Sequence, residues 1–164
     1  GVGHIGLQGR DAMSAAESTA LDLKAEARDL AADRGAHHVV DPSSADVAAE
    51  LDAITDGVGA QQVLDFVGAD VTTGYAPDIT AAGGDHHIVG YGGHIHEPAQ
   101  ALVDGEFDYR GTLVGRYAEL QELVALVERG DVALRTSRHD LGDINTVAER
   151  LEHGDVEGRA VVIP

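Results

Sequence analysis

Cysteine and tryptophan are absent from this sequence, and Lys24 is its only lysine. Without cysteine the chain holds neither disulfides nor thiolate metal sites. Only 4% of its residues are aromatic. The abundant alanine, valine and glycine suit closely packed α/β layers, in which small side chains let helices approach a sheet.

Basic residues are also scarce, with 11 against 29 acidic ones and a formal net charge of −18. Nucleic acid is therefore excluded as an expected partner, because phosphate binding needs a basic surface. The acids are spread along the chain, which indicates a solvated surface. Such a surface suits very high salt, where screening makes self-repulsion tolerable, so we expect a halophilic protein.

No apolar run approaches the ~20 residues that span a membrane, and no signal peptide precedes the first motif. We therefore expect a cytoplasmic protein with no membrane partner. The chain opens on Gly1 rather than Met, already inside a glycine motif. We interpret this opening as that of a fragment.

Strand-like and helical runs alternate as far as residue 115, with short connections. The expected strands are 18–22, 37–40, 62–67, 87–91 and 108–115. The expected helices are 4–16, 24–34, a helix capped by Ser43 or Ser44 that ends near 55, and 70–81. This order predicts an α/β fold with a doubly wound parallel sheet. Residues 116–164 then form a C-terminal α/β tail, with helices 118–129 and 142–153 and strands 132–137 and 159–163.

The opening Gly1-Val2-Gly3-His4-Ile5-Gly6 fits the dinucleotide fingerprint G-x-G-x-x-G when it is read literally. If Gly3 is instead the third glycine, a helix over 4–16 fits before the strand that begins at 18. Asp22 then follows Gly3 at the distance expected of a ribose-binding acid. We prefer this second register. It implies that the first strand and the first two glycines lie upstream.

Six motifs in order carry a family resemblance, and they extend over essentially the whole chain. They are G-V-G-H-I-G-L-Q with L-D-L-K, then G-A-H-H-V-V-D-P, V-L-D-F-V-G, G-G-D-H-H-I-V-G-Y-G-G, R-G-T-L-V-G-R and E-G-R-A-V-V-I-P. The chain resembles the medium-chain, zinc-type alcohol dehydrogenases from the middle of their fingerprint to their C-terminus. The resemblance implies a Rossmann-like domain over 1–115 and a tail, 116–164, that rejoins a catalytic domain.

The resemblance also implies roles for individual residues in binding NAD. Gly1, Val2 and Gly3 match the pyrophosphate loop, and Asp22 matches the ribose acid that favours NAD over NADP. The matches around the nicotinamide are Phe66, Val67, Val89, Gly90, Tyr91 and the strand 112–114, which includes Val114. Arg159 matches an arginine that pairs with the cofactor phosphate.

In this family the catalytic zinc is bound on the N-terminal side of the fingerprint, and zinc lowers the pKa of the alcohol so that hydride leaves. We therefore expect no catalytic residue and no metal ligand in this chain. We expect it to be inactive on its own, as part of a homo-oligomeric alcohol or polyol dehydrogenase (dimer or tetramer). Three alternatives stay open, namely a zinc-independent quinone-reductase relative, a non-catalytic dinucleotide-binding module and an S-adenosylmethionine methyltransferase.

The nine histidines invite a metal hypothesis. The adjacent pairs His37-His38 and His86-His87 lie in expected strands, so their side chains point to opposite faces. The loop segment 94–97, His-Ile-His-Glu, offers metal ligands in principle. Loop histidines are more often simply solvated, so we expect no ion there.

The acidic, lysine-poor composition makes stability dependent on salt. We expect the melting temperature to fall as salt is diluted from molar concentration to about 0.1 M, where the Debye length grows to about 10 Å. Calorimetric melting across a sodium chloride series measures this dependence. A melting temperature that is constant or rises on dilution contradicts the halophilic interpretation.

Overall fold

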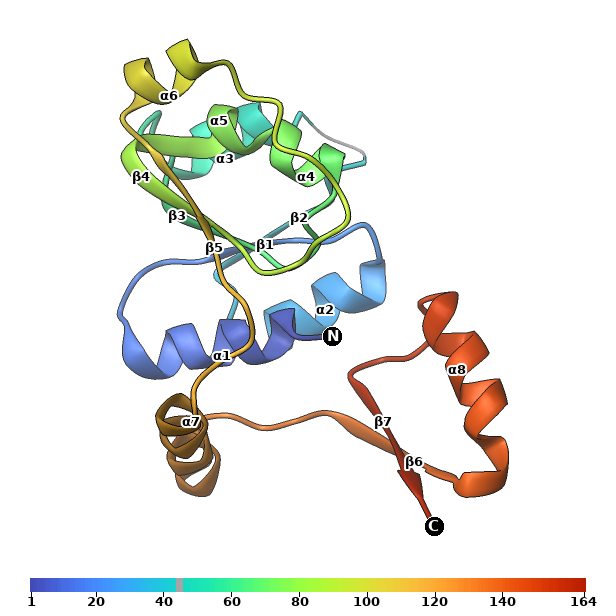
Figure 1. The fold of residues 1–164 in the computed structure, drawn as a ribbon. Coiled ribbons are helices and arrows are strands. Elements are labelled where there is room, and N and C mark those ends of the chain that lie inside the picture. The colour runs from blue at the N-terminus through green and yellow to red at the C-terminus, as the bar shows by residue number, and fades with distance from the viewer. Residues whose placement is uncertain (44–45) are drawn as a thin grey trace. The chain divides into compact units, whose positions relative to one another are not determined.

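The computed structural model describes residues 1–43 and 46–164, in which short strands and helices alternate (Figure 1). The helices are α1 (Gly3–Met13), α2 (Ala25–Asp33), α3 (Val47–Ile54), α4 (Asp70–Gly74), α5 (Ala76–Ile79), α6 (Ala99–Gly105), α7 (Tyr117–Arg129) and α8 (Ile144–Glu152), with a 3₁₀ turn at Leu141–Asp143. The strands are β1 (Thr19–Leu21), β2 (His38–Val40), β3 (Ala60–Asp65), β4 (Thr80–Ile88), β5 (Asp108–Gly111), β6 (Thr136–Asp140) and β7 (Arg159–Ile163). Among the described residues, no helix is long and apolar enough to cross a bilayer.

The described chain divides into two compact units. Residues 1–39 cluster with 116–164, and residues 40–115 form the other unit. The division into a cofactor domain and a rejoining tail at residue 115 stays a prediction.

In the unit of residues 40–115, three strands form a sheet in the order β3-β4-β5, with both pairs parallel. Helix α3 packs on α5, and α5 and α6 contact β4. The buried apolar side chains of this unit lie on β2, α3, α5 and β4 and in the connection from α6 to β5: Val40, Val47, Leu51, Ala76, Ile79, Ala81 and Phe107. Parallel strands joined through helices confirm the predicted α/β class.

In the unit of residues 1–39 and 116–164, β6 and β7 pair in parallel, with α8 between them in the chain. Helix α1 contacts α2 and α7. The buried Gln8 side chain joins α1 to the tail, because its amide donates to the Ala133 carbonyl at 3.2 Å and accepts from the Ala133 N–H at 2.9 Å.

Lys24 lies in the same unit and bonds to the backbone just beyond α8. Its ammonium donates to the Gly154 carbonyl at 2.6 Å. Cations are favoured beside the last carbonyls of a helix, where the helix dipole is negative. The only lysine of the chain therefore helps to hold the end of α8.

Two helix predictions differ from the structure. Helix α3 is capped by Asp46, whose carboxylate accepts from the Ala49 N–H at 3.2 Å. Ser43 instead bonds to Asp41, and the alternative cap, Ser44, lies outside the described residues. The expected helix 70–81 is split into α4 and α5, because Pro77 cannot donate to the preceding turn.

The strand boundaries also differ where side chains bind the backbone. The expected strand 132–137 begins only at Thr136, since Gln8 occupies both backbone groups of Ala133. β3 ends at Asp65 rather than at 67, and β4 covers 80–88 rather than 87–91. β5 ends at Gly111, and α6 was not predicted.

The Asp46 cap predicts a measurable contribution to stability. Asp46→Ala removes the acceptor at the start of α3 and is expected to lower the free energy of unfolding by about 1 kcal/mol. Asp46→Asn retains an acceptor and is expected to behave like the parent. Denaturant unfolding compares the two variants, and equal losses for both would contradict the capping role.

Candidate functional site

The carboxyl ends of β3, β4 and β5 lie side by side in one sheet. Asp65 is the Cα partner of Ile88, and Ile88 is the partner of Gly111. Six of the sequence-predicted residues lie within three positions after these three ends: Phe66, Val67, Val89, Gly90, Tyr91 and Val114. The structure therefore gathers them at one edge of the sheet, where open parallel α/β sheets bind their ligands.

This edge exposes apolar and aromatic side chains. Tyr91 is 90% exposed, Val114 is 87% exposed and Val67 is 61% exposed. Val114 also adopts a φ of 45°, a left-handed conformation that a β-branched residue rarely takes. Such backbone outliers concentrate at ligand-binding segments.

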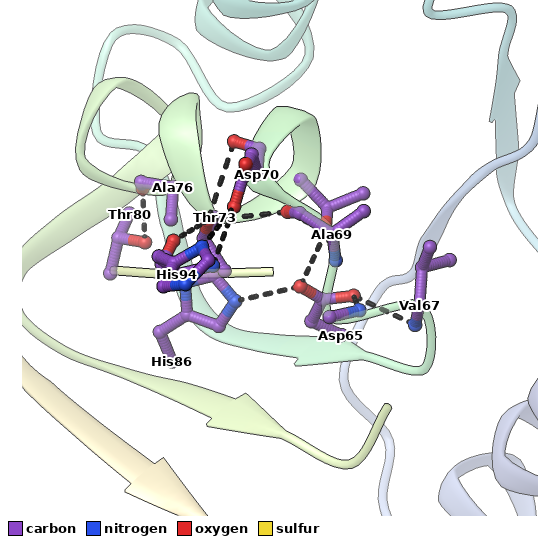
Figure 2. Close-up of polar contacts among 11 residues, drawn as sticks. Asp65, Val67, Ala69, Asp70, Thr73, Ala76, Thr80, His86 and His94 are labelled. Carbon is purple, nitrogen blue, oxygen red and sulfur yellow. Dashed lines mark hydrogen bonds and ion pairs between the residues drawn. The ribbon is translucent and has the colours of Figure 1, made fainter. Parts of the chain in front are cut away.

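The side chain of Asp65 organises the turn that begins this edge (Figure 2). Its Oδ1 accepts from the N–H groups of Val67 at 2.9 Å and Gly68 at 2.8 Å. Its Oδ2 accepts from the Thr72 hydroxyl at 2.7 Å. The carboxylate thus ends β3, turns the chain and anchors the start of α4.

The backbone carbonyl of Asp65 extends this order to the neighbouring strand. It accepts from the N–H groups of Val89 at 2.8 Å and Gly90 at 3.1 Å. A Cβ on Gly68 would overlap the backbone of Gly90, and one on Gly90 would overlap the backbone of Val67. The two segments therefore approach backbone to backbone, and only glycine fits at either position.

Asp65 is 6% exposed and stays ionised despite this burial. Burial by itself would raise the pKa of its carboxyl group. The neighbouring His86 and the hydrogen bonds to the turn outweigh that effect and lower the pKa to about 2. The His86 Nε2 lies 3.8 Å from the Asp65 Oδ2.

The remaining predicted residues lie in the other compact unit. Gly1 to Gly3 lead into α1, which has no side-chain cap and no acid in its first turn. A Cβ on Gly1 would meet no atom within 4 Å, so the space beside it is open. An uncapped helix N-terminus without acidic side chains suits a phosphate, because its N–H groups and the helix dipole attract an anion.

Asp22 and Arg159 lie within electrostatic reach of this N-terminus. Burial lowers the pKa of the Gly1 amino group, Arg159 lowers the same pKa further, and Asp22 raises it. Asp22 directly follows β1, and its exposed carboxylate accepts from the Lys24 N–H at 2.9 Å. Arg159 opens β7, and its N–H donates to the Arg135 carbonyl at 2.9 Å.

Two acids of the unit of residues 40–115, Asp65 and Asp70, were assigned no role from the sequence. Asp65 stands near the end of a predicted strand and directly before Phe66-Val67-Gly68, and this position is the sequence signal that points to it. Asp70, at the start of α4, bonds to His94, which lies 24 residues further along the chain. Such a contact has no local signature in a sequence.

The chain matches the family described as zinc-binding dehydrogenase over residues 1–129. An NAD-dependent alcohol dehydrogenase of Sulfurisphaera tokodaii is 30% identical over 100% of this chain and 48% of its own length. A D-arabinose 1-dehydrogenase (NADP(+)) of Saccharolobus solfataricus is 30% identical over 84% of this chain and 39% of its own length.

The crystal structure of an alcohol dehydrogenase from Aeropyrum pernix superposes with a TM-score of 0.95 and 43% identity. The superposition covers 100% of this chain and 47% of that one, and it confirms the predicted Rossmann-like fold class. The chain spans about half the length of the curated relatives that match all of it.

The low pKa of Asp65 predicts acid-dependent stability. A carboxylate with a depressed pKa stabilises the fold above its unfolded pKa, near 3.8, and that contribution is lost as the pH falls towards about 2. We expect Asp65→Asn to lower the free energy of unfolding by about 2 kcal/mol at neutral pH. This deficit is expected to shrink between about pH 4 and pH 2.

Denaturant unfolding at a series of pH values, at constant salt, measures this difference. Asp108→Asn, which changes an exposed acid on β5, is the matched control and is expected to match the parent at every pH. A deficit for Asp65→Asn that does not vary with pH would mean that the ionised carboxylate is not the stabilising group.

Proposed function

Because the chain belongs to the zinc-binding dehydrogenase family, we propose that it is the nicotinamide-dinucleotide-binding part of an alcohol dehydrogenase. The observation that carries the proposal is the gathering of Phe66, Val67, Val89–Tyr91 and Val114 at the carboxyl edge of one parallel sheet. A second support is the N-terminus of α1, which has no side-chain cap and no acid in its first turn.

We propose that the N–H groups at the start of α1 bind the pyrophosphate. The fit rests on the chemistry of the donors, since the first N–H groups of a helix have no partner within the helix. Arg159 supplies the positive charge near them, within electrostatic reach of Gly1. In a chain with 29 acidic side chains, this local cation counters the repulsion of a phosphate.

We propose that Asp22 binds the adenosine ribose and selects NAD over NADP. Its exposed carboxylate follows β1, and its Oδ1 is oriented by the Lys24 N–H. An ionised carboxylate accepts hydrogen bonds from both ribose hydroxyls and repels a 2′-phosphate. The matched relatives include one named for NAD and one named for NADP(+), so direct measurement is needed.

We propose that the strand-end edge holds the nicotinamide ring. Val67, Tyr91 and Val114 offer it apolar contact, while the Asp65 network fixes the backbone beneath them. A fixed backbone holds a reactive ring in one orientation, which hydride transfer requires.

The family description implies a zinc ion, and zinc supplies a Lewis acid that polarises an alcohol oxygen. This sequence has no cysteine to offer as a ligand. We therefore propose that residues outside these 164 coordinate the catalytic zinc and bind the alcohol. The oligomeric state and the cytoplasmic location stay predictions.

The ribose assignment is tested by calorimetric titration of NAD and NADP into the protein that carries this chain, in molar salt. The parent is expected to bind NAD more tightly than NADP. We expect Asp22→Ala to weaken NAD binding about 10- to 100-fold, the effect of losing hydrogen bonds to a charged group. The preference for NAD should shrink accordingly.

Asp29→Ala is the matched control, because it removes one exposed acid from α2 with the same change in net charge. It is expected to leave both affinities unchanged. A preference for NAD that survives in Asp22→Ala would remove Asp22 from the ribose role. Binding of neither dinucleotide by the parent would overturn the proposed function itself.

A further inference from the structure

The loop that follows β4 returns to the start of α4 and is fixed there by its backbone (Figure 2). The Gly93 N–H donates to the Gly68 carbonyl at 2.7 Å, and the His94 N–H donates to the Asp70 carboxylate at 2.5 Å. The Thr73 hydroxyl donates to the His94 carbonyl at 2.7 Å. Three hydrogen bonds thus define the position of His94 relative to α4.

Gly93 makes this close approach possible. A Cβ at this position would overlap the backbone of Ala69 and Asp70. The absence of a side chain therefore brings the next residue, His94, directly against the Asp70 carboxylate. The backbone of the loop thus holds residue 94 beside Asp70, and the Asp70 carboxylate accepts from its N–H.

Three ligand-bearing side chains converge at this point. One ligand atom from each of Asp70, His94 and His96 lies within 4.8 Å of the others. The His94 Nδ1 is 3.3 Å from the Asp70 Oδ1. The two imidazole ring centres are 5.6 Å apart, and their planes are tilted by 36°.

These separations match those around a tetrahedral metal ion. With bonds of about 2.0–2.1 Å, two ligand atoms on one zinc ion lie about 3.3 Å apart. Two imidazoles on the same ion have ring centres about 5 Å apart, by the same bond lengths and angle. The observed 3.3 Å between His94 and Asp70 meets this geometry, and the ring separation of 5.6 Å is close to it. Rotation of the exposed side chains about their χ angles would bring all three ligand atoms, now within 4.8 Å of one another, onto one ion.

We propose that Asp70, His94 and His96 form a binding site for a divalent transition-metal ion of the zinc class. Two imidazole nitrogens and one carboxylate oxygen are ligands that zinc and copper accept, whereas magnesium and calcium prefer oxygen alone. The side chains of His94 and Asp70 are 75% and 63% exposed, so an ion reaches them directly from solvent. The net charge of −18 raises the local concentration of cations.

The site has a consequence for the loop. His94 lies three residues beyond Tyr91, so an ion at this point ties the segment after β4 to α4. The proposal goes beyond dinucleotide binding and does not rest on it, because it depends only on the three ligands and the backbone bonds that place them. It also revises the expectation that the histidines of segment 94–97 are merely solvated.

Zinc binding is the first test, with the metal ion itself as the probe. The protein that carries this chain is stripped with a chelator, dialysed and titrated with Zn²⁺ by calorimetry. The parent is expected to bind one more equivalent than the double variant His94→Gln/His96→Gln. His153→Gln, which removes an exposed histidine at the end of α8, is the matched control and is expected to retain that equivalent.

Copper provides a second, spectroscopic test, because Cu²⁺ prefers nitrogen ligands strongly. The difference between the paramagnetic resonance spectra of the loaded parent and the loaded double variant is expected to show two nitrogen ligands. Either single variant, His94→Gln or His96→Gln, is expected to show one. Matching circular dichroism and melting of the metal-free proteins establishes that the variants are folded.

Equal zinc stoichiometry and affinity in the parent and the double variant would overturn the proposal. A difference spectrum without two nitrogens would overturn it as well, because the site requires both imidazoles. Loss of the same equivalent in His153→Gln would show that binding follows histidine number rather than this cluster, which also contradicts the assignment.

Discussion

The carboxylate of Asp65 is the constraint on which the strand-end region depends. It is buried and charged, and such a group is tolerated in a protein interior only when hydrogen bonds satisfy it. Two backbone N–H groups and the Thr72 hydroxyl do so here. Because those donors belong to the turn after β3, satisfying the charge and forming the turn are the same event.

The turn after β3 also fixes the backbone of the segments beside it. The Asp65 carbonyl accepts hydrogen bonds from the N–H groups of Val89 and Gly90 beyond β4. Gly68 lies against the Gly90 backbone, and its carbonyl accepts from the Gly93 N–H. The proposed nicotinamide edge and the proposed metal cluster therefore share one support. A change that loosens the turn is expected to disturb both places at once, although they carry different chemistry.

Much of the fold followed from the periodicity of the sequence. Apart from α6 and the split of helix 70–81, the order of strands and helices was predicted, and β7 and α7 were located to within one residue. Strand ends were misplaced where a side chain binds backbone groups, as Asp65 does in the turn after β3 and Gln8 does at Ala133 before β6. Periodicity describes only which side chains face a core, so it does not show such bonds.

The candidate site shows the same limit. The strand-end residues were named through family motifs, and the sheet register places them at one edge. Their assignment to a cofactor remains a proposal. The histidines of segment 94–97 were noticed in the sequence, but Asp70 was not connected with them. The close packing of Gly93, 23 positions further along the chain, brings Asp70 to them. Contacts of that kind depend on the path of the backbone.

The bond between Lys24 and Gly154 bears on how well position 24 tolerates substitution. A chain that uses arginine for all its other basic side chains has kept one lysine, and that ammonium is bound to a backbone carbonyl rather than left to full hydration. A lysine at a freely hydrated position is easily exchanged for another residue. Lys24 is not free in this way, because a substitution that removes its ammonium leaves the Gly154 carbonyl beyond α8 without this donor.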